Sequence, residues 1–483
     1  MKRNILSEVL LYKYRYIIGY LIFIVVLIGA IYISYHVPGQ LTVAEQNSAV
    51  SSATISLSDP STKNIIDLPF HLLQKASLHY FDITNLGIKL PSLIIGALSA
   101  VGLLWLLRRW LLRDSVAILT ICIFVSSRLF LSTSQEGTPL IMMAFWLIFV
   151  LLFALKFTAN NKSIVWGILL TASLALSLYT PLTLYVVVCL LAASILHPHL
   201  RYVVTTIPKL HFVLYLATAS LLVAPLAVAL LKDPFMLAIL AGWPDSGFSL
   251  EILRHNIKEI IKAYFFFWQP RLTEFGLTPI FSASSFVLML FGALNLVRDH
   301  HSARSYMLVM TLPILILPSL FNPSFLIILS IPFILLLGLG IETLLDEWYK
   351  LFPHNPYARV TALVPMSILL AGIMIGNLTY FINAYRYSPN LSTFYSYDLT
   401  LVRKTLNTYP DSLLVTDSKD LEFYELLRRD YANLRVTSNA EEALAANTVI
   451  SHVKPVAGPS QHLEHLSIDS YRNNGVRFYV YQK

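Results

Sequence analysis

Residues 38–52 read PGQLTVAEQNSAVSS, and residues 64–92 read NIIDLPFHLLQKASLHYFDITNLGIKLPS. These two stretches belong to one long polar loop, and an apolar run long enough to cross a bilayer flanks the loop on each side. Carboxylates are rare in a chain this apolar, so Glu45 and Asp67 are the first candidates for chemistry in the loop. The pattern predicts a membrane scaffold that presents this loop at one surface.

The composition supports a membrane protein. The chain has 483 residues, of which 56% are hydrophobic and 13% are charged. The mean hydropathy is +0.65, well above the range of soluble proteins. Both cysteines, Cys122 and Cys189, fall inside apolar runs, so we expect buried inert thiols rather than a disulfide framework or a metal site.

The apolar runs predict about eleven membrane-spanning helices, with a length of about 20 residues as the criterion. They lie at approximately 16–35, 91–111, 115–133, 139–158, 164–180, 182–198, 212–231, 277–297, 305–321, 324–345 and 360–383. The first run follows a basic tail and reads as a signal anchor that stays in place. Pro181 and Pro323 fall at two short breaks, where we expect tight turns between antiparallel helices.

The distribution of charge predicts the orientation. With the N-terminus inside, the inner segments carry fifteen basic and six acidic residues, and the outer segments before residue 386 carry nine and ten. Basic residues collect on the cytoplasmic side of membrane proteins. We therefore expect a multi-pass protein of the cell membrane with a cytoplasmic N-terminus and an extracytoplasmic C-terminus.

A second outer segment, 232–276, contains LEILRHNIKEIIKAYFFFWQP, whose apolar residues recur at helical spacing. Its polar face includes Lys262, and Arg271 follows the aromatic end. A basic amphipathic helix of this kind lies in the membrane interface. It serves either as an anchor for the loop or as a basic lip that receives a phosphate-bearing lipid.

The composition changes after residue 385. Residues 386–483 carry eleven basic and eleven acidic side chains, so the net charge of +8 belongs to the membrane part, 24 minus 16. Helices are expected at 398–409 and 420–431, and strands at 411–417, 447–453 and 477–482. This alternation predicts a small extracytoplasmic α/β domain, and its sequence contains no motif that assigns it a function.

Four short motifs resemble those of the GT-C glycosyltransferases, a group that includes the protein O-mannosyltransferases and the lipid A aminoarabinose transferase. Where that family has an acidic pair, this chain has Ala44-Glu45, and where it has D-x-PP-L, this chain has Asp67-Leu-Pro-Phe-His-Leu. Lys89-Leu-Pro-Ser takes the place of the family's RLPS before the next span. Ser134-Gln-Glu-Gly-Thr stands where relatives have SREAR.

The resemblance implies a fold, a reaction and a set of roles. Such enzymes move a sugar from a polyprenyl-phosphate carrier to an acceptor at the outer membrane face, usually with inversion, and they need no soluble nucleotide site. A carboxylate takes the acceptor proton, and positive charge stabilises the phosphate that leaves. By analogy, the catalytic candidates are Glu45, Asp67 and Glu136, and the candidates for the donor phosphate are Arg128, Lys89, Lys262 and Arg271. The sequence specifies no cofactor and leaves a divalent cation open.

Departures from the family pattern keep other functions open. Ala44 removes half of the acidic pair, and Gln135 and Thr138 replace the two arginines of the SREAR motif. The alternatives are a polytopic carrier or flippase of a lipid-linked precursor, and a non-catalytic GT-C-like scaffold. For Glu45 and Asp67, the structural alternative to a site role is a helix-capping carboxylate.

Overall fold

The computed structural model describes most of the chain. Described are residues 15–55, 65–160, 163–243, 249–267, 270–273, 276–298, 303–351, 356–388, 391, 399–439, 441–444, 446–451, 462–468 and 477–482. The basic residues Lys2, Arg3 and Lys13 of the predicted anchor lie outside this part. Every candidate site residue lies inside it.

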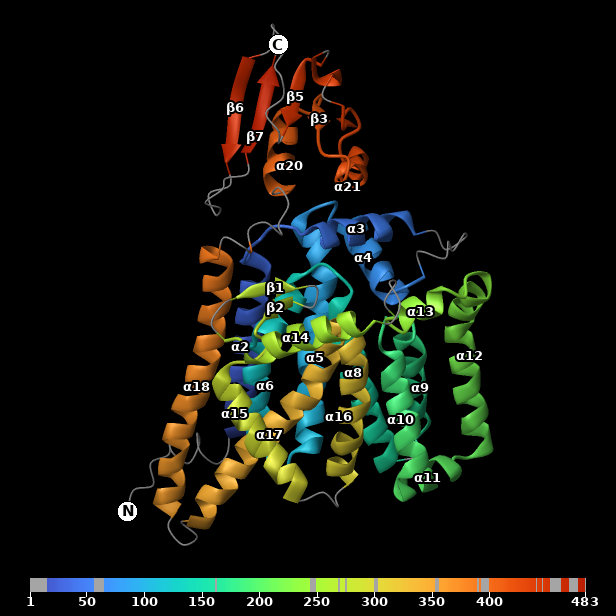
Figure 1. Ribbon diagram of the computed structural model, residues 1–483, viewed down its shortest axis with the longest axis vertical. Helices are drawn as coiled ribbons and strands as arrows, with labels where there is room; N and C mark the ends of the chain where they lie inside the picture. Colours follow the sequence, from blue (N-terminus) through green and yellow to red (C-terminus); the bar gives the residue numbers. More distant parts are fainter. Residues whose placement is uncertain are drawn as a thin grey trace.

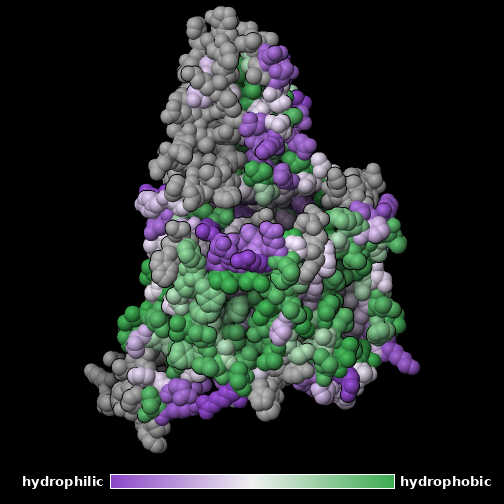
Figure 2. All heavy atoms as spheres, viewed as in Figure 1, coloured by the Kyte–Doolittle hydropathy of each residue, from purple (hydrophilic) through white to green (hydrophobic). Residues whose placement is uncertain are grey.

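Most helices of the membrane part run side by side along the length of the molecule (Figure 1). They are α2 (Arg15–His36), α5 (Asn85–Trp110), α6 (Asp114–Val125), α8 (Leu140–Ala159), α9 (Ile164–Ser177), α10 (Leu184–Leu196), α12 (Lys209–Lys232), α15 (Ala283–Arg298), α16 (Ala303–Phe321), α17 (Leu326–Leu351) and α18 (Pro356–Tyr387). Two helices of eight residues, α7 (Arg128–Gln135) and α11 (Pro198–Thr205), follow α6 and α10 at an angle. On the face seen in Figure 2, hydrophobic residues form a broad belt over these helices, with hydrophilic residues above and below it. The belt is the surface expected of a protein surrounded by lipid.

In the described residues, six helices are long and apolar enough to cross a membrane, and up to eight if each bent pair counts as one span. The bent pairs are α6–α7, with 56° between the two helices, and α10–α11, with 95°. The apolar parts of α9 (164–177), α15 (283–298) and α16 (307–321) are shorter than these candidate spans. The described residues therefore contain six to eight candidate spans, and the number of eleven spans stays a prediction.

Helices α15 and α17 approach each other closely because each has a glycine at the contact. A Cβ atom at Gly292 would lie 1.8 Å from the carbonyl oxygen of Leu336, and a Cβ atom at Gly340 would lie 1.9 Å from that of Leu288. Without side chains at these two positions the backbones touch, as at the small-residue interfaces of membrane helices. This contact fixes α17, which is buried along most of its length, in the centre of the bundle.

The loop between the first two predicted spans, residues 38–91, is called the opening loop. Its described residues form the helices α3 (Val43–Thr54) and α4 (Leu68–Tyr80) at one end of the bundle. The second outer segment forms α13 (Met236–Leu240), α14 (Leu250–Phe265) and a hairpin of β1 (Arg271–Thr273) and β2 (Gly276–Thr278). The expected amphipathic helix is thus present as α14. A short helix, η3 (Pro323–Phe325), follows the expected break before α17.

The C-terminal part contains a mixed sheet of strand order β4-β3-β5-β7-β6, in which β3 is parallel to β4 and β5, and β7 is antiparallel to β5 and β6. Its elements are α20 (Leu399–Thr408), β3 (Leu413–Val415), α21 (Leu421–Glu425), η4 (Leu426–Arg429), β4 (Arg435–Thr437), η5 (Glu442–Leu444), β5 (Thr448–Ser451), β6 (His462–Ile468) and β7 (Arg477–Gln482). The sequence patterns did not predict β4 and β6. This sheet lies at the same end of the molecule as α3 and α4 (Figure 1).

The C-terminal part packs directly on the opening loop. Leu41, Ala49 and Ile88 share one buried apolar cluster with residues of α20, α21 and the sheet. Arg403 forms an ion pair with Asp430, at 2.6 Å, and donates to the carbonyl of Ile83, at 2.8 Å. The packing therefore holds the C-terminal part of the chain against the loop that carries the candidate site.

Candidate functional site

A cluster of buried polar residues lies where α3, α4, the start of α5 and the α7–α8 connection meet. Glu45, Lys89 and Glu136 belong to it, and their relative exposures are 0%, 0% and 6%. The three residues come from separate segments of the sequence. The structure thus brings together two of the three catalytic candidates and one of the four phosphate candidates.

Glu45 is held by hydrogen bonds from two backbone amides. Its Oε2 accepts from the amide of Thr42, at 2.6 Å, while the amide of Glu45 donates to the Thr42 hydroxyl, at 3.2 Å. These reciprocal bonds form a capping box that starts α3. The Oε1 atom accepts from the amide of Gly137, at 2.8 Å, and so ties α3 to the α7–α8 connection. The structure therefore shows the capping role for Glu45 and joins it to a tertiary contact.

Lys89 supplies the positive charge of the cluster. Its Nζ lies 3.4 Å from Oε1 of Glu45 and donates to the carbonyl of Gln40, at 2.7 Å. Both side chains are fully buried, where an unpaired charge is costly and a hydrogen-bonded pair is tolerated. The ammonium group of Lys89 thus contacts both α3 and the segment before it.

Glu136 lies close enough to both charges to interact with them. Burial and the neighbouring Glu45 carboxylate raise the pKa of Glu136 to about 8, although Lys89 acts in the opposite direction. At neutral pH this side chain is mainly protonated. The cluster then combines a carboxylate, an ammonium group and a neutral carboxylic acid, the kind of separation that lets two acids take different parts in one reaction.

Sequence reasoning missed Gln74, which connects the cluster to α4. Its side-chain oxygen accepts from the hydroxyls of Ser48, at 2.8 Å, and Ser52, at 2.6 Å. Its amide nitrogen donates to the carbonyls of Ile88, at 3.0 Å, and Gly137, at 2.9 Å. A glutamine in an amphipathic pattern carries no sequence feature that predicts such a position, because all four partners are distant in the chain.

His71 extends this network on α4. Its Nδ1 lies 2.8 Å from the hydroxyl of Ser52, and burial lowers the pKa of His71 to about 4. The imidazole is therefore neutral at physiological pH. A neutral, hydrogen-bonded histidine between α3 and α4 supports the packing of the two helices.

Asp67 stands at the N-terminal end of α4. It is two helical turns from Gln74, or roughly 10 Å at 1.5 Å per residue. It has the N-cap position with φ 54°, in the left-handed region, but its side chain makes no capping hydrogen bond. The capping alternative for Asp67 is therefore wrong. Its amide donates to the carbonyl of Tyr179, at 2.8 Å, and its side chain hydrogen bonds with Thr180 at the break between α9 and α10.

Burial raises the pKa of Asp67 to about 7, although the hydrogen bond with Thr180 acts to lower it. The ionised form is thus disfavoured in the folded protein, and this part of the stability is lost as pH rises from about 4 to about 7. Between about pH 5 and about pH 8, we expect the parent to lose about 3 kcal/mol more than Asp67→Asn. Thermal unfolding at both values tests this, and equal losses in the two proteins would contradict it.

Arg128 begins α7 and lies apart from the carboxylates, about 12 Å from Glu136 along the helix at 1.5 Å per residue. Its guanidinium carbon lies 3.5 Å from the centre of the Tyr380 ring, and Nη1 donates to the carbonyl of Pro279, at 3.2 Å. The buried Nε has no hydrogen-bond partner among the described residues. A buried, partly unsatisfied guanidinium is a suitable group for an anion.

Lys262 and Arg271 have contacts within their own outer segment. Lys262 forms an ion pair with Glu259 one turn earlier on α14. The guanidinium of Arg271 lies over the ring of Phe266, at 5.7 Å. No contact found in the described residues connects either side chain with Glu45 or Glu136. In the part of the chain that the structure describes, no three His, Cys, Asp or Glu side chains form a group that could hold a metal ion.

Comparison with known proteins shows which class of fold this is. No protein-family model matches the chain. No curated protein matches it either. Solved structures do match, and they establish that the chain has the fold of the GT-C membrane glycosyltransferases.

One such structure is ArnT from Cupriavidus metallidurans bound to undecaprenyl phosphate. It has a TM-score of 0.54 and 13% identity, and the match covers 95% of this chain and 97% of that one. The apo state of the same protein has a TM-score of 0.53 and 12% identity, and the match again covers 95% of this chain and 97% of that one. An oligosaccharyltransferase from Archaeoglobus fulgidus, tethered with an acceptor peptide, gives 0.51 and 11%, with 88% of this chain and 64% of that chain covered. This chain thus spans less than two thirds of that transferase.

Proposed function

We propose that the protein is a glycosyltransferase that moves a sugar from a polyprenyl-phosphate donor to an envelope acceptor on the outer membrane face. The observation that carries the proposal is the convergence of Glu45, Glu136 and Lys89 at one end of a GT-C fold. That ArnT was solved with undecaprenyl phosphate supports a lipid-linked donor. The distribution of basic residues supports a cytoplasmic N-terminus and an extracytoplasmic C-terminal domain.

In the proposed reaction, Glu45 takes the proton of the acceptor nucleophile. The nucleophile attacks the anomeric carbon with inversion, and the bond from that carbon to the phosphate oxygen breaks, so the electron pair leaves with the phosphate. Glu136 starts as the neutral acid beside Glu45, and Lys89 provides the positive charge. Because Glu45 and Lys89 are fully buried, donor and acceptor reach them only when α3 and α4 shift.

Arg128 is the phosphate group's proposed partner on the membrane side, since its buried guanidinium retains an unsatisfied donor among the described contacts. Lys262 and Arg271 of the second outer segment are proposed to contact the donor phosphate or to guide its entry. Asp67, at the start of α4, is proposed as a further catalytic carboxyl group beside the α9–α10 break. These roles continue the assignments made from the sequence. Those of Lys262 and Arg271 can be tested apart from the cluster, because the two residues lie on α14 and β1.

The test uses the purified full chain in proteoliposomes with labelled polyprenyl-phosphate sugars. We expect transfer by the parent protein and a loss of about 100-fold or more in Glu45→Gln, the size typical of a lost general base. Activity is normalised to the folded fraction of each preparation. Glu136→Gln is the matched variant, because it removes the neighbouring acid but none of the hydrogen bonds that start α3.

Two outcomes decide against the assignment. Transfer that falls only in proportion to the folded fraction of Glu45→Gln removes this residue from the chemistry. If the parent protein transfers no sugar from any of the donors, the proposed transferase activity is contradicted. Movement of the lipid-linked sugar across the bilayer without transfer would indicate a carrier instead.

A non-catalytic scaffold is the second candidate, and a specific observation favours it. Both oxygens of Glu45 already accept hydrogen bonds from backbone amides, so the residue that would act as base also has a complete structural role. Retention of an intact donor without turnover, unaffected by Glu45→Gln, would support this function.

A further inference from the structure

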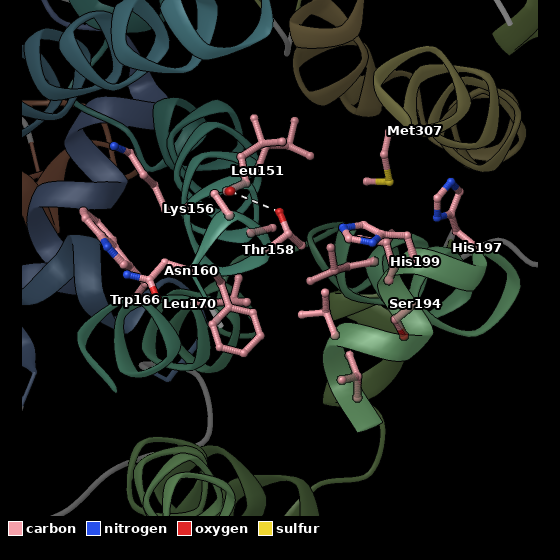
Figure 3. Close-up of a pocket in the computed structure, with 18 of the residues that line it drawn as sticks. Leu151, Lys156, Thr158, Asn160, Trp166, Leu170, Ser194, His197, His199 and Met307 are labelled. Carbon is pink, nitrogen blue, oxygen red and sulfur yellow. Dashed lines mark hydrogen bonds between the residues drawn. The ribbon is translucent and has the colours of Figure 1, made fainter. Parts of the chain in front are cut away.

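A pocket lies among the ends of α5, α8 and α10 and the start of α16 (Figure 3). Helix α11, which also lines it, is at the opposite end of the membrane part from the C-terminal sheet (Figure 1). Its volume is about 740 Å³, within the range of about 300–1,000 Å³ typical of ligand sites. It follows α8 from Leu151 to Asn160, which is about 14 Å at 1.5 Å per residue. The Glu45 cluster is at the other end, so this is a separate site.

The walls of the pocket suit a hydrocarbon chain. Leu151, Leu170 and Leu190 come from three different helices, and Val203 closes the space from α11. Helix α11 turns away from α10 by 95° and so covers the end of the pocket. Figure 3 shows His199 of α11 directed into this space toward Thr158 of α8.

The polar edge of the pocket is basic. Arg109, Lys156, His197 and His199 line it, and no acidic residue is found among its described lining residues. The charges of Arg109 and Lys156 are close enough to repel each other. The ammonium of Lys156 rests over the rings of Trp105, at 4.6 Å, and Trp166, at 5.3 Å, at one side of the pocket. Neither Arg109 nor Lys156 has an acidic partner in the described part of the chain.

We propose that this pocket binds an anionic phospholipid of the adjacent leaflet, with an acyl chain along α8 and the phosphate at the basic edge. An apolar cleft between helices with cations at the membrane surface selects an anionic headgroup, because the chain supplies the hydrophobic burial and the cations stabilise the phosphate. An uncharged or zwitterionic lipid would leave the repulsion between Arg109 and Lys156 unrelieved. This inference does not depend on the proposed transferase activity.

The test is native mass spectrometry of the purified full chain in detergent with an equimolar mixture of phosphatidylglycerol and phosphatidylcholine. We expect the parent to retain phosphatidylglycerol preferentially. Arg109→Gln and His199→Gln should each lower the ratio of bound phosphatidylglycerol to phosphatidylcholine, with about a fivefold fall for Arg109→Gln. Arg201→Gln is the matched control, because Arg201 is exposed on the same α11 helix and does not line the pocket.

A second variant tests the space itself. Leu151→Trp fills the pocket and is expected to reduce the retention of phosphatidylglycerol without changing the basic residues at the edge of the pocket. Equal retention of both lipids by the parent, or the same fall in Arg201→Gln as in Arg109→Gln, overturns the proposal. Undecaprenyl phosphate that binds in spite of Arg109→Gln and His199→Gln but is lost in Leu151→Trp also overturns it, because the pocket then holds the tail of the carrier lipid.

Discussion

Gly340→Ala is expected to destabilise the bundle by about 3 kcal/mol or more, the upper range for overpacking a core. The new Cβ atom would lie 1.9 Å from the carbonyl oxygen of Leu288, a backbone atom that no rotamer change can move away. Helices α15 and α17 would therefore have to separate along their length. Thermal unfolding of the purified protein in detergent measures the effect.

The chain provides its own control on α18. A Cβ atom at Gly372 or Gly376 would meet nothing within 4 Å. Alanine there should be neutral or stabilising by up to about 1 kcal/mol, because glycine is the poorer helix former. A Gly340→Ala protein as stable as Gly372→Ala would show that α15 and α17 do not touch through their backbones.

Glu45→Gln is expected to cost about 3–5 kcal/mol of stability, the size seen when one partner of a buried ion pair is removed. Three contacts change at once, because the Lys89 ammonium loses its counter-ion and the amides of Thr42 and Gly137 lose a charged acceptor. The double variant Glu45→Gln/Lys89→Met removes the stranded charge. The double variant should recover a large part of the lost stability. Thermal unfolding of four proteins (the parent, Glu45→Gln, Lys89→Met and the double variant) gives the coupling energy between the two residues.

The same four proteins separate structure from chemistry. If the double variant is stable again and still fails to transfer sugar, Glu45 or Lys89 acts in the reaction and not only in the fold. If the losses of stability of the two single variants simply add, the pair is not coupled, and the buried ion pair described here is contradicted.

The buried pair also explains why the candidate site is closed. Glu45 holds the start of α3 to the α7–α8 connection, and the C-terminal domain packs on the same loop through the cluster that includes Leu41 and Ala49. Movement of α3 would break the hydrogen bond to Gly137 and disturb the contact with the C-terminal domain. Any substrate of this site must therefore stabilise the open arrangement by its own contacts.

Much of the architecture follows from local sequence. Runs of about 20 apolar residues predict helices because a backbone in lipid must satisfy its own hydrogen bonds. Thr42-Val-Ala-Glu45 has the spacing of a capping box, and α3 begins there. Periodicity likewise predicts α14, and the motif set of the opening loop predicts the GT-C fold that the solved structures share.

The tertiary structure alone decides which polar residues meet. Glu45 reaches the amide N–H of Gly137 across 92 residues of sequence, and Gln74 on α4 reaches the carbonyl of the same residue. No local pattern encodes such a contact, because it depends on how α3, α4 and α7 pack. For the same reason Asp67, which the sequence presented as a catalytic candidate or as a cap, lies against Thr180, two turns of α4 from Gln74.

The opening loop shows what local sequence determines and what only tertiary packing decides. Its sequence determined that a polar, helix-forming segment with rare carboxylates stands between two membrane spans, because hydrophobicity and capping act over a few residues. Only the packing of the helices decided that Glu45 is paired with Lys89 and that Glu136 lies beside them as a neutral acid. Burial, charge and hydrogen bonding act through space, and the fold sets the distances over which they act.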